Sequence, residues 1–149
     1  MQRRSCAKLT TRLPFWILTY DRGDVMVCSI HCHPDYDYPF HSGSEDENAK
    51  GKATFHVPLK PGATWTDHYQ PALERSLSKI FGEFGAQALV VSMGLDTLQG
   101  DPVTLRRAGF AMGPNDYKPM GRLSGCKLSS KGMPCLVVQE GGYKMDQVG

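Results

Sequence analysis

The chain has 149 residues, a net charge of +2 and 40% hydrophobic residues, which together fit one globular domain with its own core. The small charge gives no basis for direct nucleic-acid binding, and no apolar run reaches the roughly 20 residues that span a membrane. The five cysteines form no CxxC pair, so we predict buried free thiols in a reducing compartment rather than a disulfide framework. This prediction covers Cys28, Cys32, Cys126 and Cys135.

Residues 1–19 differ from the rest because they contain four basic residues and no acid. An arginine-rich, acid-free start is typical of organelle transit peptides, whereas the plainer alternative is a short, poorly packed segment. We therefore treat 1–19 as an atypical basic lead-in and 20–149 as the domain itself. The expected location is cytoplasmic, with an organelle or the nucleus as alternatives.

The first predicted strand covers residues 25–30, which are apolar on both faces apart from one serine. It leads into a segment rich in histidine and aromatic residues, and then into a Gly/Ser/acidic stretch at 42–51 that should be an exposed loop. A short strand follows at 54–59. Because Pro58 cannot donate a ladder hydrogen bond, we expect this strand at an edge of the sheet.

An amphipathic helix is predicted over residues 67–84, where apolar residues recur at spacings of three or four. Pro71 lies in its first turns, so the helix either starts late or kinks there, and Gly85 suits the position just past its end. These apolar residues are Tyr69, Leu73, Leu77, Ile80 and Phe84. A strand at 88–92 follows directly, so the helix is a crossover between parallel strands.

A second helix is predicted to start at Asn115 or Asp116, either of which can cap it, and to run through Leu123. Its end is weakened from Gly125 onward, and a last strand follows at 135–138. Strands alternating with helices predict an α/β fold with a parallel sheet flanked by helices. The order of the strands cannot be read from the sequence.

Two of these strands end in polar segments of the same kind. The run ALVVSMGLDTLQGDP at 88–102 delivers Asp96, and PCLVVQEGGY at 134–143 delivers Tyr143. Ligands and catalytic groups collect at the carboxyl ends of parallel strands. We therefore expect these two side chains on one rim of the sheet.

Three segments carry a family resemblance: GLDTLQGDP at 94–102, LVVQEGGY at 136–143 and DRGDVMVCSIHCHPDYDYPFHSG at 21–43. They resemble the C-terminal half of the zinc-dependent histone deacetylase superfamily, and most closely its acetylpolyamine amidohydrolases and histone-deacetylase-like amidohydrolases. The resemblance implies an incomplete arginase/deacetylase-like fold with three layers. It also implies an acetyl-amide hydrolase whose substrates are acetylated lysine in proteins or acetylpolyamines.

In that family two aspartates and one histidine hold a zinc ion, which polarises the amide carbonyl and acidifies a water molecule. Asp96 matches the second aspartate ligand. Tyr143 matches the tyrosine whose hydroxyl donates to the developing oxyanion, and Gly141 and Gly142 match the turn beneath it. Tyr38 matches an aromatic wall of the substrate tunnel.

The resemblance further implies a structural potassium ion, with the hydroxyl of Ser29 and the carbonyl of Ile30 among its ligands. Each of these assignments has a plainer alternative. An aspartate after a strand is often a cap or turn residue, and Asp101 can simply cap the element that starts at Pro102. A tyrosine in a loop is often ordinary packing, and a buried serine often bonds to nearby backbone.

The chain also departs from the family pattern. The first aspartate and the histidine ligand belong to a DxDxHHGNGT-like motif whose region here is Ser5–Leu18, which contains neither residue type. We therefore expect one of three zinc ligands, no histidine pair for proton transfer, and no hydrolysis unless another segment supplies them. The alternative is a non-catalytic interaction module that pairs with itself or a relative through an exposed sheet edge.

The histidines and cysteines between Cys28 and His41 offer another candidate metal site, but their spacing fits no zinc-finger pattern. Alternation along an extended chain would instead place His31 and His33 on one side and the two cysteines, Cys28 and Cys32, on the other. His56 and His68 are expected at the surface or at a sheet edge rather than as ligands.

Overall fold

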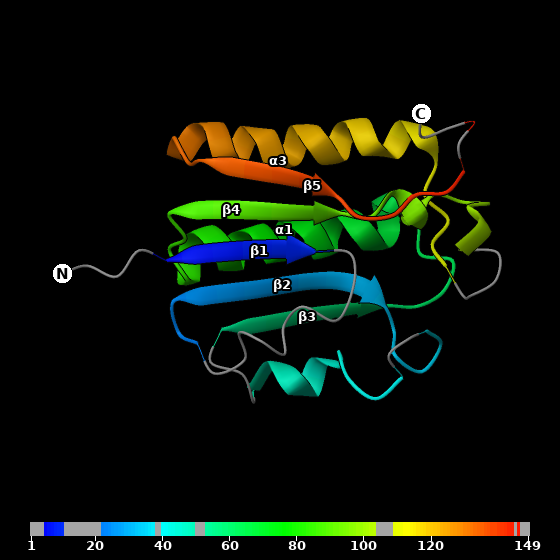
Figure 1. Ribbon diagram of the computed structural model, residues 1–149, viewed down its shortest axis with the longest axis horizontal. Coiled ribbons are helices and arrows are strands. Elements are labelled where there is room, and N and C mark those ends of the chain that lie inside the picture. Colours follow the sequence, from blue (N-terminus) through cyan, green and yellow to red (C-terminus); the bar gives the residue numbers. More distant parts are fainter. Residues whose placement is uncertain are drawn as a thin grey trace.

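The computed structural model describes residues 5–10, 22–37, 40–49, 53–103, 109–144 and 146. Within these residues the core of the molecule is a five-stranded sheet in the order β3-β2-β1-β4-β5. All four neighbouring pairs are parallel, so the five arrows point the same way in Figure 1. The strands are β1 (Cys6–Thr10), β2 (Val25–Cys32), β3 (Thr54–Leu59), β4 (Ala88–Met93) and β5 (Cys135–Gln139). The predicted α/β class with a parallel sheet is confirmed.

The central strand, β1, is the one that the sequence did not predict. It pairs with β2 on one side and β4 on the other, so that Leu9 lies opposite both Cys28 and Val91. Ala7 and Leu9 are buried in the hydrophobic core. The expectation of a poorly packed lead-in is therefore wrong for Cys6–Thr10, where two small or aliphatic side chains alternate with polar ones as in a half-buried strand.

The predicted crossover helix is present, and Pro71 shapes its start as expected. Helix α1 covers Gln70–Ser78, with the proline in its first turn, and a π-helical turn flanks it on each side (Trp65–Tyr69 and Lys79–Glu83). The helical path therefore runs from Trp65 to Glu83 without a break. Gly85, with φ of 66°, follows it as predicted. Figure 1 shows α1 packed behind the middle of the sheet.

The second helix is longer than predicted. A 3-10 turn at Pro114–Asp116 leads into α3 (Tyr117–Lys131), and the Asp116 carboxylate accepts a hydrogen bond from the Gly113 backbone N–H at 2.7 Å. The helix passes through Gly125 and ends only at Gly132, which takes a left-handed conformation with φ of 58°. Packing of the helix against the core outweighs the low helix propensity of a single glycine.

One face of the sheet and its β3 edge are covered by different elements. Core residues of β1, β2 and β4 that share one face, such as Ala7, Ile30 and Leu89, pack in one cluster with residues of α1 and α3. The outer edge of β3 is covered by a 3-10 turn at Glu45–Ala49, where Asn48 exchanges two hydrogen bonds with the backbone of His56. Among the described strands β3 pairs with β2 alone, so the edge position predicted from its proline is confirmed.

The predicted burial of the cysteines is wrong at one position. Cys135 is exposed, because every residue of β5 is exposed, whereas Cys28 is buried as expected. His56 lies in the edge strand, one of the two positions expected for it, but the residue is only 1% exposed and lies beside His31. Within the described ranges no helix has the length and apolar character needed to cross a membrane.

Candidate functional site

The carboxyl ends of β4 and β5 form the candidate site, at the right-hand end of the sheet in Figure 1. The two chains stay together past the strands: the Glu140 N–H donates to the Met93 carbonyl at 2.8 Å, and the Leu95 N–H donates to the Gly141 carbonyl at 3.3 Å. Asp96 lies in a 3-10 turn at Leu95–Thr97 directly after β4. The two segments singled out from the sequence therefore share one rim.

Gly141 and Gly142 make this close approach feasible. Both have positive φ, at 104° and 112°, which side chains other than glycine rarely adopt. A Cβ atom on Gly141 would lie 2.9 Å from an oxygen of the Asp96 carboxylate, and one on Gly142 would lie 2.7 Å from the Leu95 Cβ. The backbone of the glycine pair is thus packed directly against the turn that carries Asp96.

Helix α3 braces the same turn from its other side. The Thr97 hydroxyl and the Tyr117 hydroxyl are 2.8 Å apart, and the Tyr117 hydroxyl also donates to the Leu95 carbonyl at 3.3 Å. Burial raises the pKa of Tyr117 to about 12, with the nearby Asp96 adding to the shift. Tyr117 therefore stays a neutral hydrogen-bond donor, and it holds the turn without competing as a base.

Asp101 does more than the capping role that the sequence suggested. One carboxylate oxygen accepts the Val103 N–H at 2.9 Å, which is the predicted cap. The other oxygen accepts the N–H groups of Tyr143 and Lys144 at 2.6 and 3.0 Å. Sequence reasoning missed this second role, because a capping aspartate carries no signal of a partner so distant along the chain.

Tyr143 itself is 48% exposed, so its ring lies at the surface of the rim. Asp96 is half-buried. Tyr38, the predicted wall of the substrate tunnel, lies outside the described residues. The predicted roles of these three side chains remain predictions, while the shared rim of Asp96 and Tyr143 is a feature of the fold.

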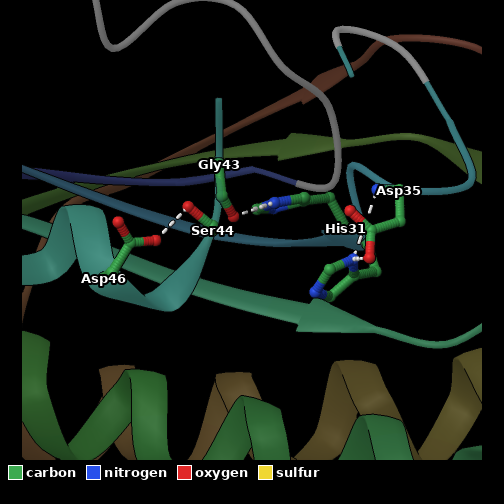
Figure 2. A network of polar contacts seen from close by, with 6 residues as sticks. His31, Asp35, Gly43, Ser44 and Asp46 are labelled. Atoms are coloured by element: carbon green, nitrogen blue, oxygen red, sulfur yellow. Dashed lines mark hydrogen bonds and ion pairs between the residues drawn. The ribbon is translucent and has the colours of Figure 1, made fainter. Parts of the chain in front are cut away.

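Ser29 and Ile30, the predicted potassium ligands, are fully buried in β2. The Ser29 hydroxyl is 2.9 Å from Nδ1 of His31. Nε2 of His31 is 2.8 Å from the carbonyl oxygen of Gly43, the contact drawn in Figure 2. His56 lies edge-on to His31, with ring centroids 5.6 Å apart. Sequence reasoning missed this buried pair, although the alternation of β2 had correctly placed His31 on the face opposite Cys28.

The described residues do not provide the ligand set of a catalytic zinc ion. Three protein ligands are typical of a catalytic zinc site, but no group of three His, Cys, Asp or Glu side chains comes together in the described part of the chain. The lead-in matched to the missing ligand motif forms β1, and Cys6–Thr10 contains no Asp or His. These residues do not fit a zinc ion by themselves.

Comparison with known proteins gives a consistent result. A family model described as the histone deacetylase domain matches residues 17–149. The chain is 38% identical over 133 residues to Acetylpolyamine amidohydrolase 2 of Pseudomonas aeruginosa and 37% identical over 133 residues to an acetylpolyamine amidohydrolase of Mycoplana ramosa. Each alignment covers 87% of this chain but only 36% of the relative, so the chain spans about a third of their length.

Solved structures extend the similarity to the fold. An acetylpolyamine aminohydrolase from Burkholderia pseudomallei superimposes with a TM-score of 0.80 at 25% identity, over 97% of this chain and 41% of that one. An HDAC homologue in complex with SAHA superimposes with a TM-score of 0.78 at 20% identity, over 95% of this chain and 37% of that one. The arrangement of strands and helices described above is thus an arrangement found in these larger proteins.

Proposed function

Because this chain belongs to the histone deacetylase domain family, we propose that it forms part of the active site of an amidohydrolase that removes acetyl groups from acetyl-lysine or acetylpolyamines. The observation that carries the proposal is the contact between the Asp96 turn and the Gly141–Tyr143 segment, which brings a carboxylate and a phenol to one rim. The two relatives above that are named as acetylpolyamine amidohydrolases favour acetylpolyamines as the first substrates to test.

In the proposed site the chain's own residues have distinct tasks. The Tyr143 hydroxyl donates a hydrogen bond to the oxygen that becomes negative when the amide is attacked, which stabilises the transition state more than the substrate. The Asp96 carboxylate would supply one ligand of the family's zinc. The remaining zinc ligands and the proton-transferring histidines would come from a segment outside residues 17–149.

A chimera tests this proposal. Residues 17–149 would replace the matching part of Acetylpolyamine amidohydrolase 2 from P. aeruginosa, so that the relative supplies everything else. We expect the 149-residue chain alone to release no acetate from an acetylpolyamine or an acetyl-lysine peptide, and the zinc-loaded chimera to release it. Tyr143→Phe should lower kcat of the chimera by about 100- to 1000-fold, while Tyr36→Phe should not.

Two results would contradict the proposal. One is a folded, zinc-loaded chimera that hydrolyses neither substrate. The other is a chimera whose rate is unchanged by Tyr143→Phe or by Asp96→Asn, since both residues are assigned to the reacting centre.

The exposure of β5 favours a second candidate, an interaction module. Leu136 and Val137 are each 59% exposed and Val138 is 36% exposed, although they belong to an apolar strand at the edge of a parallel sheet. An exposed apolar edge strand is a template for pairing with another strand. Size-exclusion chromatography over a dilution series discriminates between the two candidates. The elution volume of a self-associating chain depends on its concentration, whereas that of a monomeric chain is constant.

A further inference from the structure

Asp101 joins two loops that are far apart in the sequence. Its side chain is fully buried, and its two oxygens accept three backbone N–H groups, one from Val103 in its own loop and two from Tyr143 and Lys144. The Tyr143 contact spans 42 positions and measures 2.6 Å. A carboxylate buried in this way is stable only when such donors satisfy it. These three hydrogen bonds, called the Asp101 clamp below, tie the segment after β5 to the segment after β4.

The residues just before Tyr143 give its backbone little guidance of their own. Gly141 and Gly142 precede it, and glycine restricts the backbone less than any other residue. The ties nearest to them are the 3.3 Å bond from Leu95 to the Gly141 carbonyl and the 2.8 Å bond from Glu140 to Met93. Neither holds Gly142, which links them to Tyr143, by a hydrogen bond of its own. The direction in which the tyrosine leaves the chain is thus fixed by what holds Tyr143 and Lys144 directly.

We infer that Asp101 is the positioning residue for Tyr143: its buried carboxylate holds the two backbone N–H groups at and after the tyrosine, and so sets where the phenol lies on the rim. Hydrogen bonds from N–H groups to a carboxylate are among the stronger ones in proteins, which suits a contact that must outweigh two glycines. The catalytic meaning of the clamp rests on the proposed function, whereas the clamp itself does not.

Amide hydrogen exchange of the full chain, read residue by residue by NMR, tests the clamp. Asp101→Asn keeps the shape of the side chain but replaces one accepting oxygen with an NH₂ group. We expect the Tyr143 and Lys144 amides to exchange about tenfold faster, and the Tyr143 ring to become more mobile while the Tyr117 ring does not. Asp116→Asn is the matched control, because Asp116 also accepts a backbone N–H, at Gly113, and should change exchange only there.

An increase of less than about threefold at both Tyr143 and Lys144 would overturn the inference. If Asp101→Asn does not fold, the wild-type chain supplies the answer: a scalar coupling across the hydrogen bond between the Tyr143 amide nitrogen and the Asp101 carboxyl carbon supports the clamp, and its absence overturns it. Neither measurement needs hydrolysis, so an inactive chimera would refute the proposed function and leave the clamp standing. In an active chimera, Asp101→Asn should lower kcat and leave KM nearly unchanged, as expected for a lost transition-state contact.

Discussion

Gly141 shows at the scale of one residue how closely the two halves of the rim fit together. Its missing side chain leaves room for the Asp96 carboxylate, and its φ of 104° turns the chain toward Tyr143. A glycine in the sequence motif EGGY marks a turn, but only the structure identifies the group that the turn approaches. The same residue therefore serves both the backbone path and the packing of a candidate metal ligand.

Gly141→Ala should destabilise the chain by about 1–3 kcal/mol, because the new Cβ meets Asp96 at 2.9 Å and the positive φ becomes strained. Gly125→Ala is the control: that glycine lies in α3 with no atom within 4 Å of an added Cβ, so alanine should stabilise by about 0.5–1 kcal/mol. Urea unfolding of the two variants measures both effects. Equal effects would show that the rim is not tightly packed.

Acid sensitivity is also decided by single residues. Burial is the main reason why the pKa of His31 and that of His56 are lowered from 6.5 to about 4. Between pH 6.5 and 4 the unfolded chain therefore binds protons at these two histidines that the folded chain does not. Their contribution to the free energy of unfolding is fully present above pH 6.5 and is lost as the pH falls toward 4. The full shift corresponds to about 3 kcal/mol for each residue at most.

Urea unfolding at pH 7.5, 6.0 and 5.0 measures this loss. His31→Gln should flatten the dependence on pH, because one of the two buried imidazoles is removed. His68→Gln, on an exposed part of the first helical turn, should leave the dependence as in the wild type. A wild-type chain whose unfolding free energy stays constant across this range would contradict the burial of the histidine pair.

At the scale of elements, β5 is the strand whose surroundings are least complete. Among the described strands it pairs with β4 alone, and all five of its residues are exposed. Val137 is its middle residue, so two antiparallel copies of Cys135–Gln139 could pair symmetrically about it, with Leu136 of each facing Val138 of the other. Such pairing would give β5 a neighbour on its outer edge, as β4 has neighbours on both of its edges in β1 and β5.

Val137→Lys should therefore reduce any concentration-dependent self-association while leaving the unfolding midpoint of the dilute chain unchanged, because charged residues on edge strands oppose pairing. Tyr36→Lys replaces a similarly exposed side chain in a loop and should have no effect. Sedimentation velocity over a dilution series measures both variants. In the wild type, Cys135 should react faster with a thiol reagent as the chain is diluted, whereas equal rates would contradict pairing through β5.

The elements that the sequence predicted are those with a strong local pattern. Residues 67–84 repeat apolar side chains at helical spacing, and strands β2 and β4 are short apolar runs bounded by turns. Strand β1 was missed because its five residues, CAKLT, offer only Ala7 and Leu9 as buried apolar side chains among polar neighbours. Its strand character comes from the partners on both sides, which no local pattern contains.

The candidate site likewise contains residues that the local sequence identifies and contacts that it does not. Asp96 and Tyr143 could be assigned because each follows a recognisable strand and a distinctive motif. The Asp101 clamp and the His31–His56 contact could not, because both join residues brought together only by the sheet. Local sequence therefore identified the groups at the ends of the strands, and the fold supplied the contacts that hold them in place.

At the scale of the whole molecule, the sheet depends on β1, which joins its two halves. Among the described strands, β2 and β3 lie on one side of β1 and β4 and β5 on the other, and no other strand connects them. The candidate metal ligand Asp96 follows β4, and the predicted potassium ligands lie in β2. Whatever occupies the central position therefore sets the distance between the two predicted ion sites.

Leu9→Ala tests this dependence. Leu9 is 6% exposed and lies opposite Cys28 and Val91, so removing its side chain should cost about 2–5 kcal/mol, a large fraction of the 5–15 kcal/mol typical of a domain. Leu136→Ala is the matched control, since that leucine is 59% exposed in β5 and its loss should cost well under 1 kcal/mol. Urea unfolding of the dilute chain measures both. Similar costs for the two leucines would mean that residues 6–10 do not hold the sheet together, and that the lead-in is as loosely packed as its sequence suggested.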